Sequence, residues 1–205
     1  MFAEHTKWYL MSKASATRLN ILQAAFDLIY RKGFQATSID DIIATTHVTK
    51  GAFFYHFKNK EEMGLSIINE IMYPSMIPFM LQFLERSGDV RKNIYEMMKS
   101  LLLKAPSFKV EYGCPAVNLI EEMAPLNETF RTALSQLVVR WQKAIEEALI
   151  KAQAAGDISA QHNPKAISMY ITSTYGGIRN MGKIFGRGAY NQFLKEFKKY
   201  LDTLN

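Results

Sequence analysis

The sequence predicts an all-α protein in which three short N-terminal helices precede a larger helical bundle. Apolar residues recur at the helical spacing almost throughout the chain, and no run alternates apolar and polar residues as a half-buried strand does. Polar breaks that contain helix-capping residues separate the apolar stripes. The chain contains no internal repeat and no low-complexity tract.

The first two helices are expected to follow one another closely. An apolar stripe ends at Gly33, which suits a helix C-terminus. Thr37 and Ser38 each precede an aspartate at capping-box spacing, Asp40 and Asp41, so a second helix is expected to begin here. The residues of the first stripe are Ile21, Leu22, Ala25, Phe26, Leu28 and Ile29.

A short polar break precedes the third helix. Thr49 has the features of its N-cap, and Val48 and Phe53 stand at the spacing of a hydrophobic staple. Asn59 is expected to cap a fourth helix, with Glu62 reaching back to that cap. Short helices joined by tight turns are typical of a helix-turn-helix motif, whose second helix enters the major groove of DNA.

Longer helices are expected in the rest of the chain. Pro74 and Pro78 should kink or divide the segment that follows the fourth helix. The expected domains are an N-terminal arm over residues 1–15, a helix-turn-helix domain over 16–60 and a C-terminal domain over 61–205. The later helices are expected over about residues 90–104, from Cys114-Pro115, from Asn127 to Gly156, from Pro164 to Met181 and from Tyr190 to Leu204.

The composition suits a protein of a reducing compartment such as the cytoplasm. Cys114 is the only cysteine, so no internal disulfide can form. No apolar run is long enough to span a bilayer, and no membrane partner is expected. Glu4, His5 and Lys7 interrupt the N-terminus, which is therefore not expected to be a signal peptide. It is expected to be a poorly ordered arm, or to result from a start codon ahead of Met11.

Positive charge gathers in the first part of the chain, which suits a polyanionic partner. The net charge is +6; residues 1–60 contain eight Lys or Arg against four Asp or Glu, whereas residues 61–205 contain seventeen against fifteen. Residues 48–62, VTKGAFFYHFKNKEE, combine rings with cations. Phe53 and Phe57 are expected to face the core, which leaves the other rings and the lysines for the grooves and phosphates of DNA.

Residues from about 16 to 71 resemble the DNA-binding domain of the TetR/AcrR family of bacterial transcriptional regulators. The resemblance rests on Ala24, Phe26, Gly33 and Thr37, on IDDI at 39–42, VTKG at 48–51 and FYHF at 54–57, and on Lys60-Glu61. It implies a homodimer that binds a near-palindromic operator in double-stranded DNA, with two recognition helices in successive major grooves.

The resemblance also implies which side chains contact DNA. Ala52 and Phe54 lie on the same surface but depart from the family pattern, since many relatives have a polar residue at the first position and tyrosine at the second. These departures leave the operator sequence open. The implied phosphate contacts are Thr37, Tyr55, His56 and Lys60. The implied contacts to bases or to the DNA backbone are Thr49, Lys50 and Gly51.

The C-terminal domain resembles the family only in architecture. The family uses this domain to bind a small-molecule effector and to dimerise through its last two long helices, here Pro164–Met181 and Tyr190–Leu204. Small residues such as Ser173 and Gly177 would allow close approach of two helices, although the same residues suit a helix buried within the monomer. An effector pocket is expected among the middle helices, apolar with a few polar groups. Its candidate lining residues are Tyr112, Cys114, Asn118, Glu121, Trp141, Tyr170 and Tyr175.

Cys114 has two interpretations. It stands at an expected helix start, where free N–H groups favour a reactive thiolate. The segment YGCPAVNL at 112–119 resembles a branch of the family in which some members respond to electrophiles or oxidants through cysteine. The favoured alternative is a small buried residue, which free cysteines usually are.

No catalytic site, metal site or cofactor is predicted. The four histidines show no metal-ligand spacing with one another or with Cys114, and no Ser-His-Asp or paired-carboxylate arrangement stands out. The run GIRNMGK at 177–183 has the spacing of a phosphate-binding loop. Ile184 follows where Ser or Thr is needed, however, and no strand precedes the run, so helix packing and a flexible loop explain these glycines better.

The sequence therefore favours a ligand-responsive transcriptional regulator, a repressor in its simplest form, although the operator position decides between repression and activation. One alternative is a helical small-molecule carrier or enzyme with a vestigial DNA-binding motif. The intact Thr49-Lys50-Gly51 and Lys60 argue against it. A second alternative is an architectural DNA-binding protein without a ligand, which the large C-terminal bundle disfavours.

Overall fold

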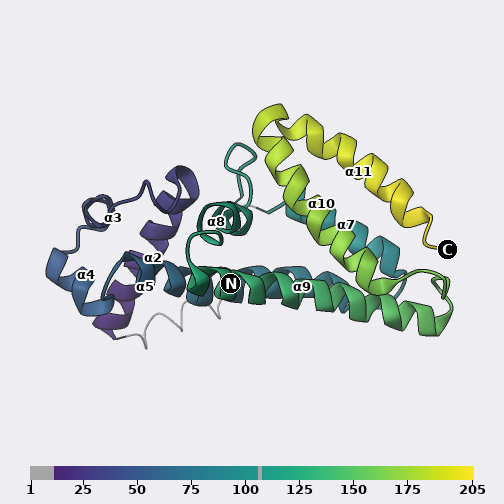
Figure 1. Ribbon diagram of the computed structural model, residues 1–205, viewed down its shortest axis with the longest axis horizontal. Helices are drawn as coiled ribbons and strands as arrows, with labels where there is room; N and C mark the ends of the chain where they lie inside the picture. Colours follow the sequence, from purple (N-terminus) through teal and green to yellow (C-terminus); the bar gives the residue numbers. More distant parts are fainter. Residues whose placement is uncertain (1–11, 106–107) are drawn as a thin grey trace, which may run out of the picture. The chain divides into compact units, whose positions relative to one another are not determined.

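The computed structural model describes residues 12–105 and 108–205, and every regular element within them is helical (Figure 1). The all-α fold class is confirmed. The chain divides into two compact units, and the division falls between Met72 and Tyr73. Residues 1–11, most of the expected N-terminal arm, lie outside the described residues. Residues 13–15 of that arm belong to the first described helix.

The first unit holds the predicted short helices. Helix α2 packs against α3 and α4, and α3 packs against α4, which is the arrangement expected of a helix-turn-helix. The unit extends beyond the expected boundary at residue 60, because α5 and η1 belong to it. Its elements are α2 (Lys13–Lys32), α3 (Ile39–Thr46), α4 (Lys50–His56), α5 (Lys60–Ser66) and the π-helix η1 (Ile67–Met72).

A capping box begins α3. The Ser38 Oγ accepts from the backbone N–H of Asp41, and the Asp41 carboxylate accepts from the backbone N–H of Ser38, both at 3.0 Å. The hydrogen bond from the Ser38 backbone holds the pKa of Asp41 below its ordinary value. The other predicted start, at Thr37 with Asp40, is wrong because the Thr37 hydroxyl donates to the carbonyl of Gly33 at 2.7 Å.

The caps of α4 and α5 confirm the predicted helix starts. The Thr49 hydroxyl accepts from the N–H of Ala52 at 3.1 Å, and the Asn59 Oδ1 accepts from the N–H of Glu62 at 2.8 Å. Glu62 differs from expectation, since its carboxylate accepts from the N–H of Lys58 at 2.9 Å and not from that of Asn59.

Arg18 on α2 joins several segments of the first unit. Its guanidinium donates to both carboxylate oxygens of Glu70 in η1, to the Ser66 Oγ at 2.9 Å and to the backbone carbonyl of His56 at 3.0 Å. The guanidinium carbon also lies 4.4 Å from the centre of the Phe57 ring. One side chain thereby connects α2, the end of α4, α5 and η1.

The second unit is a bundle of six helices within the described residues. Helix α10 packs on α9 and α11, α7 packs on α6 and α11, and α8 packs on α9. Figure 1 shows α10 and α11 as an antiparallel pair joined by a tight turn. The helices are α6 (Tyr73–Leu84), α7 (Val90–Leu103), α8 (Pro115–Met123), α9 (Glu128–Ala155), α10 (Pro164–Phe185) and α11 (Arg187–Asp202).

Two sequence expectations change in this unit. Pro74 and Pro78 both lie within α6, so neither residue divides the chain. The glycine run at 177–183 is not a loop, because α10 continues through it. Gly182 is required for packing: a Cβ there would lie 2.3 Å from a ring carbon of the buried Tyr190. Helix packing therefore explains this glycine, and the flexible loop does not.

We expect the Arg18→Met substitution to loosen the first unit. Methionine keeps an apolar contact with Phe57 but cannot donate to Glu70 or to the His56 carbonyl. Amide hydrogen–deuterium exchange in the full chain should show the opening free energy of α4 and η1 falling by about 2 kcal/mol, the size expected for hydrogen bonds that involve a charged group. The control is Arg31→Met on the exposed last turn of α2, which should change the opening free energy of α4 and η1 by less than about 0.5 kcal/mol. Equal exchange in both variants would contradict this role for Arg18.

Candidate nucleic-acid interface and effector cavity

Helix α4 separates its aromatic residues between core and solvent. Phe53 and the following C-cap Phe57 are buried, as expected, and their ring centres lie 5.6 Å apart. Phe54 and Tyr55 are 46% and 77% exposed. His56 is half-buried, and its ring meets the Tyr55 ring edge-on at 4.9 Å. Tyr55 therefore contributes little to the core, whereas the partly covered Phe54 ring meets the Phe53 ring edge-on at 5.4 Å.

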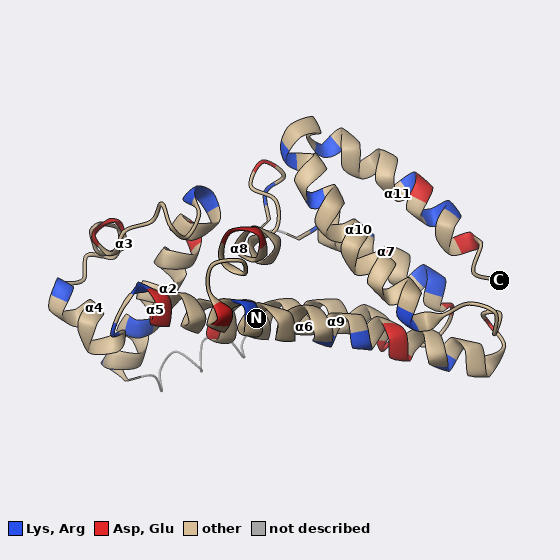
Figure 2. Ribbon diagram, viewed as in Figure 1, with Lys and Arg blue, Asp and Glu red and all other residues tan. Residues whose placement is uncertain are grey.

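The N-terminus of α4 presents small and basic residues to solvent. The Lys50 Nζ lies 3.2 Å from an Asp40 carboxylate oxygen, so the acidic start of α3 approaches the basic start of α4 (Figure 2). A Cβ at Gly51 would meet only the Thr49 hydroxyl, at 3.9 Å. The chain's own packing therefore does not require a glycine at this position. Ala52 is half-buried and contributes a methyl group to the same turn.

Two residues of the implied DNA contacts have hydrogen-bond partners within the fold. Thr37 is fully buried, and its hydroxyl is bonded to Gly33, which counts against a direct contact with phosphate. The Lys60 ammonium donates to the carbonyls of Phe34 and Thr37, each at 3.1 Å, and lies 4.7 Å from the Phe34 ring centre. It also reaches the carbonyl of Gln35 at 3.4 Å, so it ties the start of α5 to the turn between α2 and α3.

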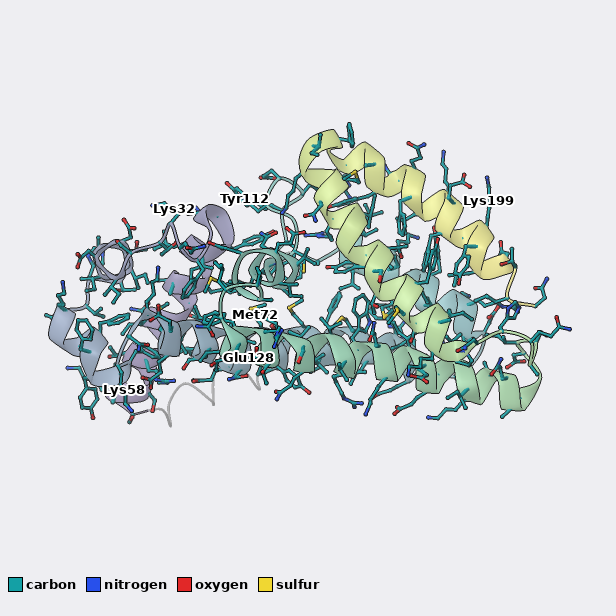
Figure 3. The ribbon with its side chains drawn as sticks, in the orientation of Figure 1. Lys32, Lys58, Met72, Tyr112, Glu128 and Lys199 are labelled. Atoms are coloured by element: carbon teal, nitrogen blue, oxygen red, sulfur yellow. The ribbon has the colours of Figure 1, made fainter. Side chains whose placement is uncertain are left out.

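Lys58 is the exposed cation that follows α4 directly (Figure 3). Its backbone N–H is held by Glu62, while its side chain points outward from the helix-turn-helix (Figure 3). The cluster of rings and cations in the sequence already indicated this lysine. Asp40 gave no such signal, because its position at a helix start explained it as a capping residue.

The second unit contains a cavity of about 380 Å³ among α6, α8, α9 and α10. Its wall is mainly apolar, which suits a small-molecule site. Four of the seven candidate residues line it: Cys114, Glu121, Trp141 and Tyr175. Residues that sequence analysis did not assign to the pocket also line it, among them Met76, Gln142, Thr172, Ser173, Gly176, Gly177 and Asn180.

The other three candidates lie elsewhere. Tyr112 is in the segment before α8 (Figure 3), where its backbone carbonyl accepts from the Asn118 Nδ2 at 2.8 Å. The Asn118 Oδ1 accepts from the Lys183 Nζ at 2.7 Å. Tyr170 is 46% exposed, and its ring centre lies 4.5 Å from that of Tyr200. Helical spacing alone does not distinguish these positions from the cavity wall.

Tyr175 is the buried polar group of the cavity wall. Its hydroxyl makes no hydrogen bond of normal geometry among the described residues, although the Cys114 thiol lies close enough to interact with it, and the Trp141 ring meets its ring edge-on at 5.3 Å. Burial raises the pKa of Tyr175, and the neighbouring Cys114 raises it further, while Arg179 acts in the opposite direction. The phenol is therefore neutral and can donate a hydrogen bond to a ligand.

Arg179 lies behind this wall and is fully buried. It donates to the backbone carbonyl of Gly113 and stands near the rings of Phe108 and Tyr190, 5.7 and 5.6 Å from their centres. These contacts hold the segment before α8 against α10. Cys114 itself is fully buried, as the favoured interpretation expected.

The site geometry agrees with what comparison to known families finds. Residues 21–67 match the bacterial regulatory proteins of the tetR family, and residues 91–196 match the tetracyclin repressor-like C-terminal domain. The chain belongs to the TetR family of bacterial regulators. The family resemblance inferred from the motif is confirmed, and the protein is a transcriptional regulator with a helix-turn-helix DNA-binding domain.

Individual relatives agree with this assignment. An uncharacterized HTH-type transcriptional regulator from the lacX 3' region of Lactococcus lactis is 37% identical over 133 residues, 65% of this chain and 68% of that one. The transcriptional regulator AcuR of Cereibacter sphaeroides is 28% identical over 159 residues, 76% of this chain and 71% of its own. The crystal structure of regulatory protein TetR from Rhodobacter sphaeroides superposes with a TM-score of 0.78 at 26% identity, covering 90% of this chain and 98% of that one.

The described residues contain neither a membrane-spanning helix nor a metal-ligand cluster. No helix in this part of the chain is long and apolar enough to cross a bilayer. Within the same residues, no group of three or more His, Cys, Asp or Glu side chains is placed to hold a metal ion.

Lys60 and Lys58 should differ when each is replaced by methionine. Lys60→Met removes the ammonium from the turn carbonyls. Amide exchange should therefore show that the free energy of opening of the turn between α2 and α3 falls by about 1–3 kcal/mol. Lys58→Met should leave that opening unchanged within about 0.5 kcal/mol. It should instead weaken binding to duplex DNA and reduce the slope of log affinity against log salt by about 1. If Lys60→Met leaves the opening of the turn unchanged and only reduces the slope of log affinity against log salt, Lys60 is a simple phosphate contact.

Proposed function

We propose that this regulator is a homodimeric repressor that binds a near-palindromic operator and is released from it by a small-molecule effector. The observation that carries the DNA-binding part is the exposed face of α4. Lys50, Phe54 and Tyr55 lie on this face, while Phe53 and Phe57 anchor the same helix in the core. Phe54 and Tyr55 are large rings left in water, and a DNA groove would cover them.

Each DNA-facing group has a distinct task in this proposal. Thr49 and Lys50 enter the major groove at the N-terminus of α4, since residues at this end of a recognition helix meet base edges. Gly51 permits close approach of the DNA, which agrees with the open space around it. Tyr55, His56 and Lys58 contact the phosphate backbone, which adds affinity but no sequence information. Thr37 and Lys60 support this surface from within and do not touch the DNA.

The homodimer is proposed to form through α10 and α11. Helix α10 carries an exposed apolar stripe, in which Ile184 and Phe185 are 70% and 68% exposed. Such a stripe is unfavourable in water and suits a second copy of the same helix. Other members of the stripe are Met169, Tyr170, Ser173, Gly177 and Met181.

The effector is proposed to occupy the cavity next to Tyr175. The unpartnered phenol would donate a hydrogen bond to it, and Trp141 and Met76 would contact its apolar part. Binding releases the operator only if the effector prefers the conformation with low DNA affinity.

The cavity disfavours an architectural DNA-binding protein without a ligand. The exposed basic and aromatic side chains of α4 disfavour a carrier or enzyme with a vestigial motif. We propose no enzymatic activity, and a cytoplasmic location follows from an operator on the bacterial chromosome.

Selection of bound duplexes from a random DNA library at near-physiological salt should recover a palindromic consensus. Lys50→Ala should weaken binding to this consensus by about 5- to 100-fold, because a good base contact discriminates by about 1–3 kcal/mol. Tyr55→Ala should weaken binding to all duplexes alike, because a phosphate contact carries no sequence information. Recovery of no sequence preference would contradict the proposed function.

Ile184→Glu should dissociate the dimer, because it places a charge on each copy within an apolar contact. Sedimentation equilibrium of the full chain should show monomers at concentrations where the unmodified protein is dimeric. The matched control is Ile150→Glu on α9, where the native isoleucine is 50% exposed outside the α10 stripe. Dissociation of both variants alike, or of neither, would place the dimer contact elsewhere.

A further inference from the structure

We propose that Asp40 and Lys50 together read one G·C base pair in each half of the operator. Lys50 donates to the guanine O6 and N7, and the Asp40 carboxylate accepts from the exposed 4-amino proton of the paired cytosine. This inference rests on the proposed operator binding and names what the interface reads.

The two side chains come from different helices of the motif. Asp40 is the second residue of α3, and Lys50 is the first residue of α4. Their charged atoms are 3.2 Å apart, and the side chains are 77% and 64% exposed. Because the first residues of a recognition helix meet base edges, a carboxylate bonded to Lys50 stands at the same edge.

The cap of α3 does not require Asp40, although a carboxylate in the first turn of a helix is weakly favourable. The neighbouring Asp41 forms the capping box with Ser38, so α3 has its N-terminal cap without the Asp40 side chain. An ion pair as exposed as Asp40–Lys50 contributes little to stability. A carboxylate on a DNA-facing surface also repels phosphates, and a hydrogen bond from a base would offset that repulsion.

The geometry of the pair matches one base pair. In the major groove, the guanine O6 acceptor lies beside the cytosine N4 donor, and the hydrogen bond between them sets their separation at about 2.9 Å. The Lys50 Nζ and the Asp40 oxygen present a donor and an acceptor 3.2 Å apart. The protein donor can therefore face O6 while the protein acceptor faces N4.

An A·T pair also presents an adjacent donor and acceptor, but its flanking groups are unfavourable. Beside the adenine amino group lies N7, an acceptor that would repel Asp40. Beside the thymine O4 lies the methyl group, which offers nothing to Lys50. In a G·C pair Lys50 gains a second acceptor, the guanine N7, on its own side. A G·C pair is thus favoured over an A·T pair both on the Lys50 side and on the Asp40 side.

The test is a set of affinities of the full-chain dimer for the selected operator. Each base pair of a half-site is changed in turn, for the unmodified protein, Asp40→Asn, Asp40→Ala and the control Asp27→Asn. Asp27 is an exposed carboxylate on α2, so its replacement removes the same charge away from Lys50. We expect one position where the unmodified protein prefers G·C by about tenfold. Both Asp40 variants should reduce this preference to about threefold or less, while their binding to random-sequence DNA becomes tighter.

A modified base makes the test more specific. N4-methylcytosine at that position replaces the outward amino proton, so it should weaken binding by the unmodified protein by about tenfold and leave binding by Asp40→Ala unchanged. 7-Deazaguanine in the same pair should weaken binding only while Lys50 is present.

Three outcomes would overturn the inference. In the first, Asp40→Ala tightens binding to every sequence equally, so the carboxylate is only repulsive. In the second, the position that responds to Asp40 prefers A·T. In the third, N4-methylcytosine affects the unmodified protein and Asp40→Ala alike. A protein that binds DNA without any sequence preference would instead overturn the proposed function itself, and the inference with it.

Discussion

The first unit depends on the contacts that the guanidinium of Arg18 makes. The last carbonyls of a short helix have no partner within it, and Arg18 supplies one to the His56 carbonyl at the end of α4. The same group stacks on Phe57 and pairs with Glu70, so one side chain holds α4 against α2 and η1. A helix of seven residues has little stability by itself. Its orientation, and with it the direction of Lys50 and Tyr55, comes from these tertiary contacts.

The proposed DNA-facing surface consists of the side chains that the packing of the first unit leaves exposed. Phe53 and Phe57 are buried, and Thr37 and Lys60 are bonded to the turn between α2 and α3. A cation that already donates to backbone carbonyls is a poor candidate for a phosphate contact. In the proposed binding mode, fewer side chains are therefore left for DNA than the sequence suggested, and they are concentrated at the N-terminus of α4 and at Lys58.

The second unit combines close packing with one open volume. Around Arg179 and Tyr190 the helices approach so closely that Gly182 has no room for a side chain. A few residues away, the hydroxyl of Tyr175 is buried beside the cavity without a partner. Burying a polar group without a hydrogen bond costs stability, and a ligand that accepts from this phenol would remove that cost. The proposed effector site and the close packing of the bundle thus both involve the same helix, α10.

The sequence alone determined the features that depend on residues close to one another along the chain. Capping residues such as Ser38, Thr49 and Asn59 act within three positions, and the pattern of apolar residues marked Phe53 and Phe57 as core. The family motif, being contiguous, could also be recognised without coordinates. The tertiary structure decided the features that depend on residues far apart along the chain. Arg18 meets Glu70 across 52 positions, Lys60 meets the carbonyl of Phe34 across 26, and the cavity gathers residues from four helices. Spacing along a helix indicates which face a residue occupies, but only the packing of other helices determines what that face meets.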